Sequence, residues 1–107
     1  MYANGKTTMS VSYEFDDQEQ HLTVYVKGHF NFSLVSEFRN IYSKVNKTKK
    51  ITIDFGHTDV IDSSGLGILL YLQKHYGCKR DNIILTNCNT AITKTFNMAQ
   101  FKKLFTY

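Results

Sequence analysis

The chain has no proline and no tryptophan, and its 107 residues include two cysteines and six glycines. So little glycine and proline excludes collagen-like and low-complexity segments. The two cysteines, Cys78 and Cys88, form neither a disulfide framework nor a recognised metal-ligand spacing. We therefore expect two reduced thiols, no metal site and no cofactor.

Long hydrophobic runs are also lacking. No apolar stretch approaches the roughly 20 residues that a membrane-spanning helix needs. No basic-then-apolar segment of the secretory type opens the chain. Together with free thiols, which a reducing compartment tolerates, these absences predict a cytoplasmic protein without membrane insertion.

The excess of positive charge is small: the chain has 13 Lys and Arg residues and 9 Asp and Glu residues, which give a formal net charge of +4. The basic residues fall into three groups: Lys44, Lys47, Lys49 and Lys50; Lys79 and Arg80; Lys102 and Lys103. A nucleic-acid surface is one interpretation, but no aromatics interleave with these groups and no recognised nucleic-acid motif is present. Solvated helix ends and loops explain them better, since cations favour helix C-termini. We expect no nucleic-acid partner.

The remaining composition is that of an ordinary globular domain, with 42% hydrophobic, 21% charged and 14% aromatic residues. A chain of this length can bury a modest core without metals, disulfides or oligomerisation. We therefore expect a single domain over residues 1–107, monomeric when free. The polar residues 1–7 are expected to be loosely ordered.

Alternating apolar residues predict a β-hairpin at the start of the chain. Apolar side chains occupy every second position from Met9 to Phe15 and again from His21 to Lys27, which is the period of a strand with one buried face. The acidic pair Asp16-Asp17 predicts the turn between them. Gly28 is expected to end the second strand.

Helices and strands alternate in the rest of the chain. Ser33 is the expected N-cap of a helix whose apolar face holds Leu34, Val35, Phe38, Ile41, Tyr42 and Val45. Strands are predicted at 51–55 and 82–86, separated by an apolar helix that ends at Gly77. Thr90 is expected to cap a third helix, and an apolar terminal segment includes Phe101, Leu104 and Phe105. This order predicts an α/β fold, a mixed sheet with an N-terminal antiparallel hairpin and helices packed on it.

The segment Asp62-Ser63-Ser64-Gly65-Leu66-Gly67 is the most informative stretch. Two hydroxyl side chains lie at the start of an expected helix, where unpaired N–H groups and a partial positive charge stabilise an anion. One interpretation is a serine that receives a phosphate from a docked kinase. The other is structural: Asp62 or Ser63 caps the helix, and the glycines fit a tight strand–helix junction.

Catalytic alternatives have less support. The segment is neither a Walker phosphate loop nor a Gly-x-Ser-x-Gly nucleophile elbow. A serine hydrolase would need a histidine beside Ser64, and nothing in the sequence fixes His57 or the other three histidines as a base.

The sequence resembles the STAS domain family, particularly its single-domain bacterial anti-sigma factor antagonists. The resemblance rests on Ile51–Phe55 followed by Val60–Leu70, which contains the Asp-Ser-Ser-Gly-Leu-Gly segment. Gly28–Phe32 is similar to the turn after the second strand of that family, and Phe96, Phe101 and Leu104 are similar to its last helix. The resemblance extends over about residues 9–106.

This resemblance implies a non-enzymatic regulator of transcription that works by partner switching. The unphosphorylated protein would bind an anti-sigma factor that is also its serine kinase, phosphorylation of Ser64 would break the complex, and a serine phosphatase would restore it. Many family members carry an acid after the second strand, at the position of Asn31, and that acid is associated with kinase contact. Two alternatives remain open: a soluble STAS subunit of a lipid-transport complex, and a module that senses a nucleotide or another small ligand.

We expect a single partner surface at the ends of the strands, where open α/β sheets place their sites. It would combine the first turn of the motif helix, the loop 57–62 and the turn 28–32. Ile68 and Tyr71 lie off the line of Leu66, Leu69, Leu70 and Gln73, so one of the two is expected to be exposed. The predicted partner-binding residues are Asn31, Asp62, Ser63, Ser64, Gly65, Leu66, Gly67, Ile68 and Tyr71, with Ser64 as the phosphorylation site.

Overall fold

The computed structural model describes residues 10–107, which form four strands and three α-helices. The strands are β1 (Val11–Asp16), β2 (His21–Phe30), β3 (Lys50–Ile61) and β4 (Ile83–Thr86); the helices are α1 (Val35–Lys44), α2 (Ser63–Tyr76) and α3 (Thr90–Met98). Three short 3-10 turns, η1 (Phe32–Leu34), η2 (Arg80–Asn82) and η3 (Phe101–Lys103), complete them. The expected strand start at Met9 and the loose ordering of residues 1–7 lie outside the described residues.

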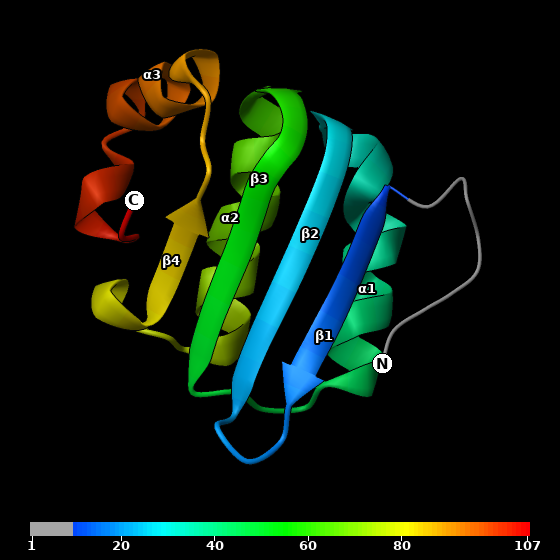
Figure 1. Cartoon of the computed structure of the whole chain (residues 1–107). Coiled ribbons are helices and arrows are strands. Elements are labelled where there is room, and N and C mark those ends of the chain that lie inside the picture. The colour runs from blue at the N-terminus through cyan, green and yellow to red at the C-terminus, as the bar shows by residue number, and fades with distance from the viewer. Residues whose placement is uncertain (1–9) are drawn as a thin grey trace.

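The four strands form one mixed sheet in the order β1-β2-β3-β4. β1 pairs with β2 antiparallel, whereas β2 with β3 and β3 with β4 pair parallel. α1 and α2 lie side by side on one face of this sheet, and α3 lies beyond the end of β4 (Figure 1). The predicted α/β fold with an opening hairpin is confirmed.

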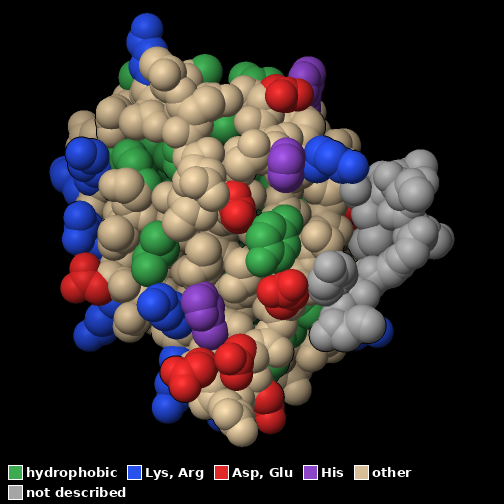
Figure 2. Space-filling model, viewed as in Figure 1, with side chains coloured by type: hydrophobic (Ala, Val, Ile, Leu, Met, Phe, Trp, Pro, Cys, Tyr) green, Lys and Arg blue, Asp and Glu red, His purple; other side chains and the backbone are tan. Residues whose placement is uncertain are grey.

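The core lies between the sheet and the helices α1 and α2, and it also includes Ile92 and Phe96 of α3 and Phe101 and Phe105 of the C-terminal segment. Alternate residues of each strand point into it, among them Val24, Ile53 and Leu85, and from α2 come Leu69 and Leu72. The opposite face of the sheet is polar or mixed, as the alternation predicted. Figure 2 shows this face, with basic side chains gathered at its edge over β4 and the C-terminal segment.

Both central strands run further than predicted. Gly28 does not end β2, which continues to Phe30, and residues 57–61 belong to β3 instead of a loop. The β2–β3 register is irregular here, with Gly28 at a φ of 83° and the buried Thr58 Oγ1 donating to the Val26 carbonyl over 2.8 Å. These non-local bonds extend the strands past a residue that would locally end one.

Two helix N-caps lie earlier in the chain than predicted, one by two residues and the other by one. Asn31, and not Ser33, caps the first helical segment, which begins as η1 before α1 starts at Val35. Asn89, and not Thr90, caps α3 through a bond to the Ile92 N–H. Asparagine is as good an N-cap as serine or threonine, so composition alone does not distinguish such neighbours. The C-cap at Gly77 is confirmed, with a φ of 67°.

The thiols behave as expected, since Cys78 is buried, Cys88 is half-buried and both are free. Burial, followed by the nearby Asp54 carboxylate, raises the pKa of Cys88 to about 11. At neutral pH it is therefore an unreactive thiol.

Candidate functional site

The site is built around the N-terminus of α2, where Asp62 is the N-cap. Its backbone is extended and its carboxylate accepts a hydrogen bond from the Gly65 N–H over 3.0 Å. The Asp62 carbonyl also accepts from the Leu66 N–H, which closes the first helical turn. The structural interpretation of Asp62 as a cap is therefore correct, and it fixes the side chains that follow.

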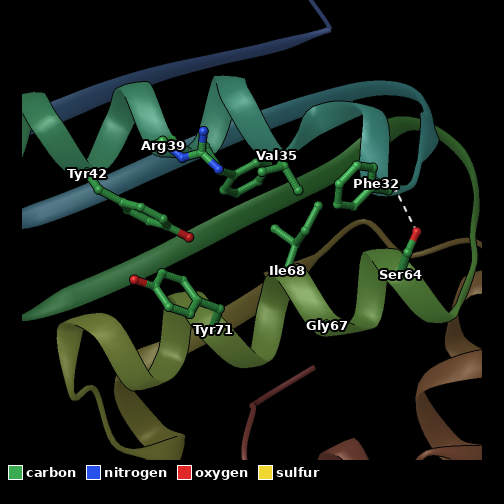
Figure 3. Close-up of a pocket in the computed structure, with 9 residues that line it drawn as sticks. Phe32, Val35, Arg39, Tyr42, Ser64, Gly67, Ile68 and Tyr71 are labelled. Atoms are coloured by element: carbon green, nitrogen blue, oxygen red, sulfur yellow. Dashed lines mark hydrogen bonds between the residues drawn. The ribbon is translucent and has the colours of Figure 1, made fainter.

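The hydroxyl of Ser64 is held on both sides. It donates to Asp62 Oδ1 over 2.7 Å. It also accepts from the Phe32 N–H over 2.8 Å, the bond drawn in Figure 3. The second bond joins α2 to the turn that follows β2, although the two residues are far apart in sequence. Ser64 is half-buried, so this side chain both orders the junction and remains accessible.

The same bonds tune the Asp62 carboxyl. The hydrogen bond from Ser64, followed by the one from the Gly65 N–H, lowers the pKa of Asp62 from its ordinary value. Both bonds favour the charged form because a carboxylate accepts hydrogen bonds better than a carboxylic acid. A negative charge therefore lies beside the Ser64 hydroxyl at neutral pH.

Gly65 is required by the close approach of α2 to β2. A Cβ at this position would lie 2.4 Å from the Phe30 carbonyl oxygen and 2.7 Å from Ile61 Cγ1. Only glycine allows this contact, and the contact places the neighbouring Ser64 within reach of the Phe32 N–H. Gly67 is different, because a Cβ there would meet nothing within 4 Å.

Two other predicted residues lie nearby with separate roles. Ser63 is the exposed first residue of α2, and within residues 10–107 its hydroxyl makes no hydrogen bond. Asn31 accepts hydrogen bonds from the N–H and the hydroxyl of Ser33, at 2.9 and 2.6 Å. Asn31 therefore shapes the turn that presents Phe32 to Ser64.

A cavity of about 520 Å³ extends from Ser64 along the groove between α1 and α2 (Figure 3). Its lining is mostly apolar and comprises Phe32, Val35, Phe38, Arg39, Tyr42, Ser64, Gly67, Ile68 and Tyr71. Helical periodicity predicts Val35, Phe38 and Tyr42 on the apolar side of their helix and Arg39 on the opposite, polar side. Only the packing of α1 beside α2 shows that these residues form one wall of a cavity.

Apolar side chains flank the mouth of this groove. Phe32 is 71% exposed and Tyr71 is 57% exposed, whereas Ile68 is only 7% exposed and forms part of the cavity wall. Of the two residues considered, Tyr71 is thus the exposed one. Leu70 is also exposed, at 40%. The buried face of α2 consists of Gly65, Ile68, Leu69 and Leu72, so the prediction that Leu70 lies on the apolar line of this helix was wrong.

The three segments predicted to form the partner surface have different surroundings in the structure. The turn at Asn31 and Phe32 contacts the first turn of α2 directly, through Ser64. The segment 57–61 is a strand, and the carbonyls of Thr58 and Asp59 accept bonds from Asn89 Nδ2 at the start of α3. This segment therefore also supports α3.

The arrangement does not suit nucleophilic catalysis. The hydrogen-bond acceptor of the Ser64 hydroxyl is the Asp62 carboxylate rather than a histidine. His21 is bonded to Thr52, and His75 packs against Tyr42, Tyr71 and Tyr76. Among residues 10–107, no group of three potential ligands could hold a metal ion, and no helix is long and apolar enough to cross a membrane.

Comparison with known proteins identifies the family. The STAS domain model matches residues 12–107. The chain belongs to the STAS domain family. A STAS-domain-containing protein of Pseudomonas aeruginosa is 34% identical over 87 residues, which are 80% of this chain and 86% of that protein.

Two solved structures share the STAS fold with this chain. A candidate anti-sigma factor antagonist of Thermotoga maritima superimposes with a TM-score of 0.69 at 16% identity, covering 88% of this chain and 81% of that one. The anti-sigma factor antagonist SpoIIAA in its unphosphorylated form superimposes with a TM-score of 0.63 at 19% identity, covering 91% and 87%. At these identities the likeness shows a common STAS architecture.

Proposed function

We propose that this protein is an anti-sigma factor antagonist. In its unphosphorylated form it binds an anti-sigma factor that has serine kinase activity, and phosphorylation at Ser64 releases that partner. A serine phosphatase returns it to the binding form. The protein acts as a binding module and not as an enzyme.

The observation that carries the proposal is the position of Ser64. Its hydroxyl lies at the N-terminus of α2, half-buried, between the Asp62 carboxylate and the exposed Phe32. The solved structures with the same fold include anti-sigma factor antagonists, one of them in an explicitly unphosphorylated form. A partner that covers Phe32 and Tyr71 would also cover this hydroxyl.

Phosphorylation of Ser64 would change both the charge and the hydrogen bonds of the site. A phosphate adds about −1.5 to −2 charges at neutral pH and removes the proton that Ser64 donates to Asp62. The phosphate and the Asp62 carboxylate repel each other, so the phosphate turns outward, toward solvent and the mouth of the groove. The fold tolerates the charge because it lies at a helix N-terminus. A partner surface fitted to a neutral hydroxyl would instead have to desolvate a dianion, which is costly.

The test is a substitution series against the purified anti-sigma factor kinase. Ser64→Ala should bind it and resist phosphorylation, whereas Ser64→Asp should fold and bind more weakly. Ser63→Ala is the matched control, because it removes a hydroxyl one residue away that makes no hydrogen bond within the described residues; it should bind and accept phosphate normally. Binding is measured by calorimetry, phosphate by mass spectrometry and folding by circular dichroism.

Two results would contradict the proposal. One is a phosphate found on Ser63 while Ser64 remains unmodified. The other is equal affinity of Ser64→Ala and Ser64→Asp for the partner when both are folded, because charge at Ser64 would then not control binding.

A further inference from the structure

Gly67 has no steric requirement in this fold. It lies inside α2, where glycine costs about 0.5–1 kcal/mol of stability relative to alanine. A Cβ at Gly67 would meet nothing within 4 Å, in contrast to Gly65 two residues earlier. Gly67 is exposed and is one of the residues that line the cavity between α1 and α2. The glycine therefore leaves this side of the cavity free of a side chain, at a cost to the helix.

The size and lining of this cavity fit a small molecule. Its volume of about 520 Å³ lies within the range of roughly 300–1,000 Å³ typical of small-ligand pockets. Val35 from α1 faces Ile68 from α2 across it, with Tyr42 and Tyr71 at one end and Ser64 at the other (Figure 3). An extended apolar molecule can lie along this groove, from Ser64 toward Tyr42 and Tyr71.

The charge of the cavity lining indicates which polar group such a ligand would carry. Arg39 is the one charged residue among the nine that line the cavity. Within residues 10–107 the side chains that form an ion pair are Arg80 and Asp81, so the guanidinium of Arg39 has no carboxylate partner there. A guanidinium binds a carboxylate through two parallel hydrogen bonds. A single carboxylate on an otherwise apolar molecule would therefore complement this lining.

We propose that the cavity between α1 and α2 is a binding site for a small apolar molecule that carries one carboxylate. The apolar body lies between Val35 and Ile68 over the open side of Gly67, and the carboxylate pairs with Arg39. The site goes beyond the proposed function and can be tested on the protein alone. Because Ser64 lines the same cavity, an occupant would also lie beside the residue proposed for phosphorylation.

The experiment uses two probes with the same ten-carbon chain and opposite charge, decanoate and decan-1-amine, below their micelle-forming concentrations. Each is titrated into the full chain while methyl and amide NMR shifts are followed. Decanoate is expected to bind saturably and to shift Val35, Ile68 and Gly67 most. Decan-1-amine is expected to bind at least tenfold more weakly, because its charge has the same sign as Arg39.

Two matched pairs of variants locate the site. Gly67→Leu places a side chain in the cavity and should weaken decanoate binding at least tenfold, whereas Ala91→Leu places the same side chain at an exposed position of α3 and should not. Arg39→Gln should weaken decanoate several-fold and reduce its advantage over decan-1-amine. Lys44→Gln removes the same charge from the end of α1, outside the cavity, and should leave both affinities unchanged. Arg39 is exposed, so its variant remains informative even if Gly67→Leu is unstable.

Several results would overturn the proposal: no saturable binding of decanoate, shifts confined to another face, or an affinity that Gly67→Leu and Arg39→Gln both leave unchanged. A cavity that instead receives a side chain of a protein partner would give no decanoate binding but weaker partner binding by Gly67→Leu. Failure of the ligand site leaves the Ser64 series unaffected, so the two proposals fail separately.

Discussion

Replacing each of the two motif glycines by alanine should change stability in opposite directions. Both residues lie near the start of α2, and alanine is the better helix former by about 1 kcal/mol at either position. The surroundings differ, because Gly65 lies against the backbone of β2 and Gly67 borders open space. The pair therefore separates a glycine needed for packing from one that packing does not require.

The expected magnitudes follow from the distances. At Gly65 the new Cβ would lie 2.4 Å from the Phe30 carbonyl oxygen, a backbone atom that moves only with the strand. Overpacking of this kind costs about 1–3 kcal/mol, and a rigid neighbour favours the upper end. After the gain in helix propensity, Gly65→Ala should destabilise the protein by about 2 kcal/mol. Gly67→Ala has only the gain and should stabilise it by about 0.5–1 kcal/mol.

The assay is urea unfolding followed by circular dichroism and tyrosine fluorescence, with thermal melts as a second measurement. A change of 1 kcal/mol shifts the melting temperature of a domain of this size by about 4–8 °C, so both effects are measurable. Gly65→Ala should also disturb the bond between Ser64 and the Phe32 N–H, which amide NMR shifts of Phe32 would report. If the two variants change stability with the same sign, the close contact of α2 with β2 is not what requires Gly65.

Two further predictions concern titratable groups. The pKa of Asp62 is lowered in the folded protein, so its contribution to stability is present above the pKa of the unfolded chain and is lost as pH falls through the folded pKa. Asp62→Asn keeps a capping side chain, and the acid limb of its stability curve should be flatter than that of the wild type; identical curves would contradict this. Burial, followed by the charges of Cys78 and Tyr13, raises the pKa of Tyr76 from its ordinary value of 10.0 to about 12, so stability should fall as pH rises between these values. Tyr76→Phe removes the hydroxyl that donates to the Val45 carbonyl over 2.8 Å and should cost about 1 kcal/mol in urea unfolding at neutral pH, with a weaker alkaline pH dependence; an unchanged midpoint would refute the role of this bond.

The sequence by itself determined the order and type of the elements. Alternation in the hairpin, the helical spacing of apolar residues and Gly77 at the end of α2 are local signals, because each depends on residues within a few positions of one another. The motif Asp62–Gly67 likewise predicted a helix N-terminus with a cap, since capping requires only neighbouring residues. The resemblance carried by that motif predicted the family, which the match over residues 12–107 confirmed.

The tertiary structure decided what depends on distant residues meeting. β2 continues beyond Gly28, and β3 continues beyond His57, because the two strands pair with each other past those residues. Gly65 and Gly67 look equivalent in the motif, yet only one of them faces the Phe30 carbonyl. The cavity beside Ser64 exists because α1 and α2 pack side by side on the same face of the sheet (Figure 1). This packing brings Arg39, which is far from Ser64 in the sequence, into the lining of the cavity. Local patterns specify which elements form; the long-range packing of those elements creates the surface that a partner or ligand would contact.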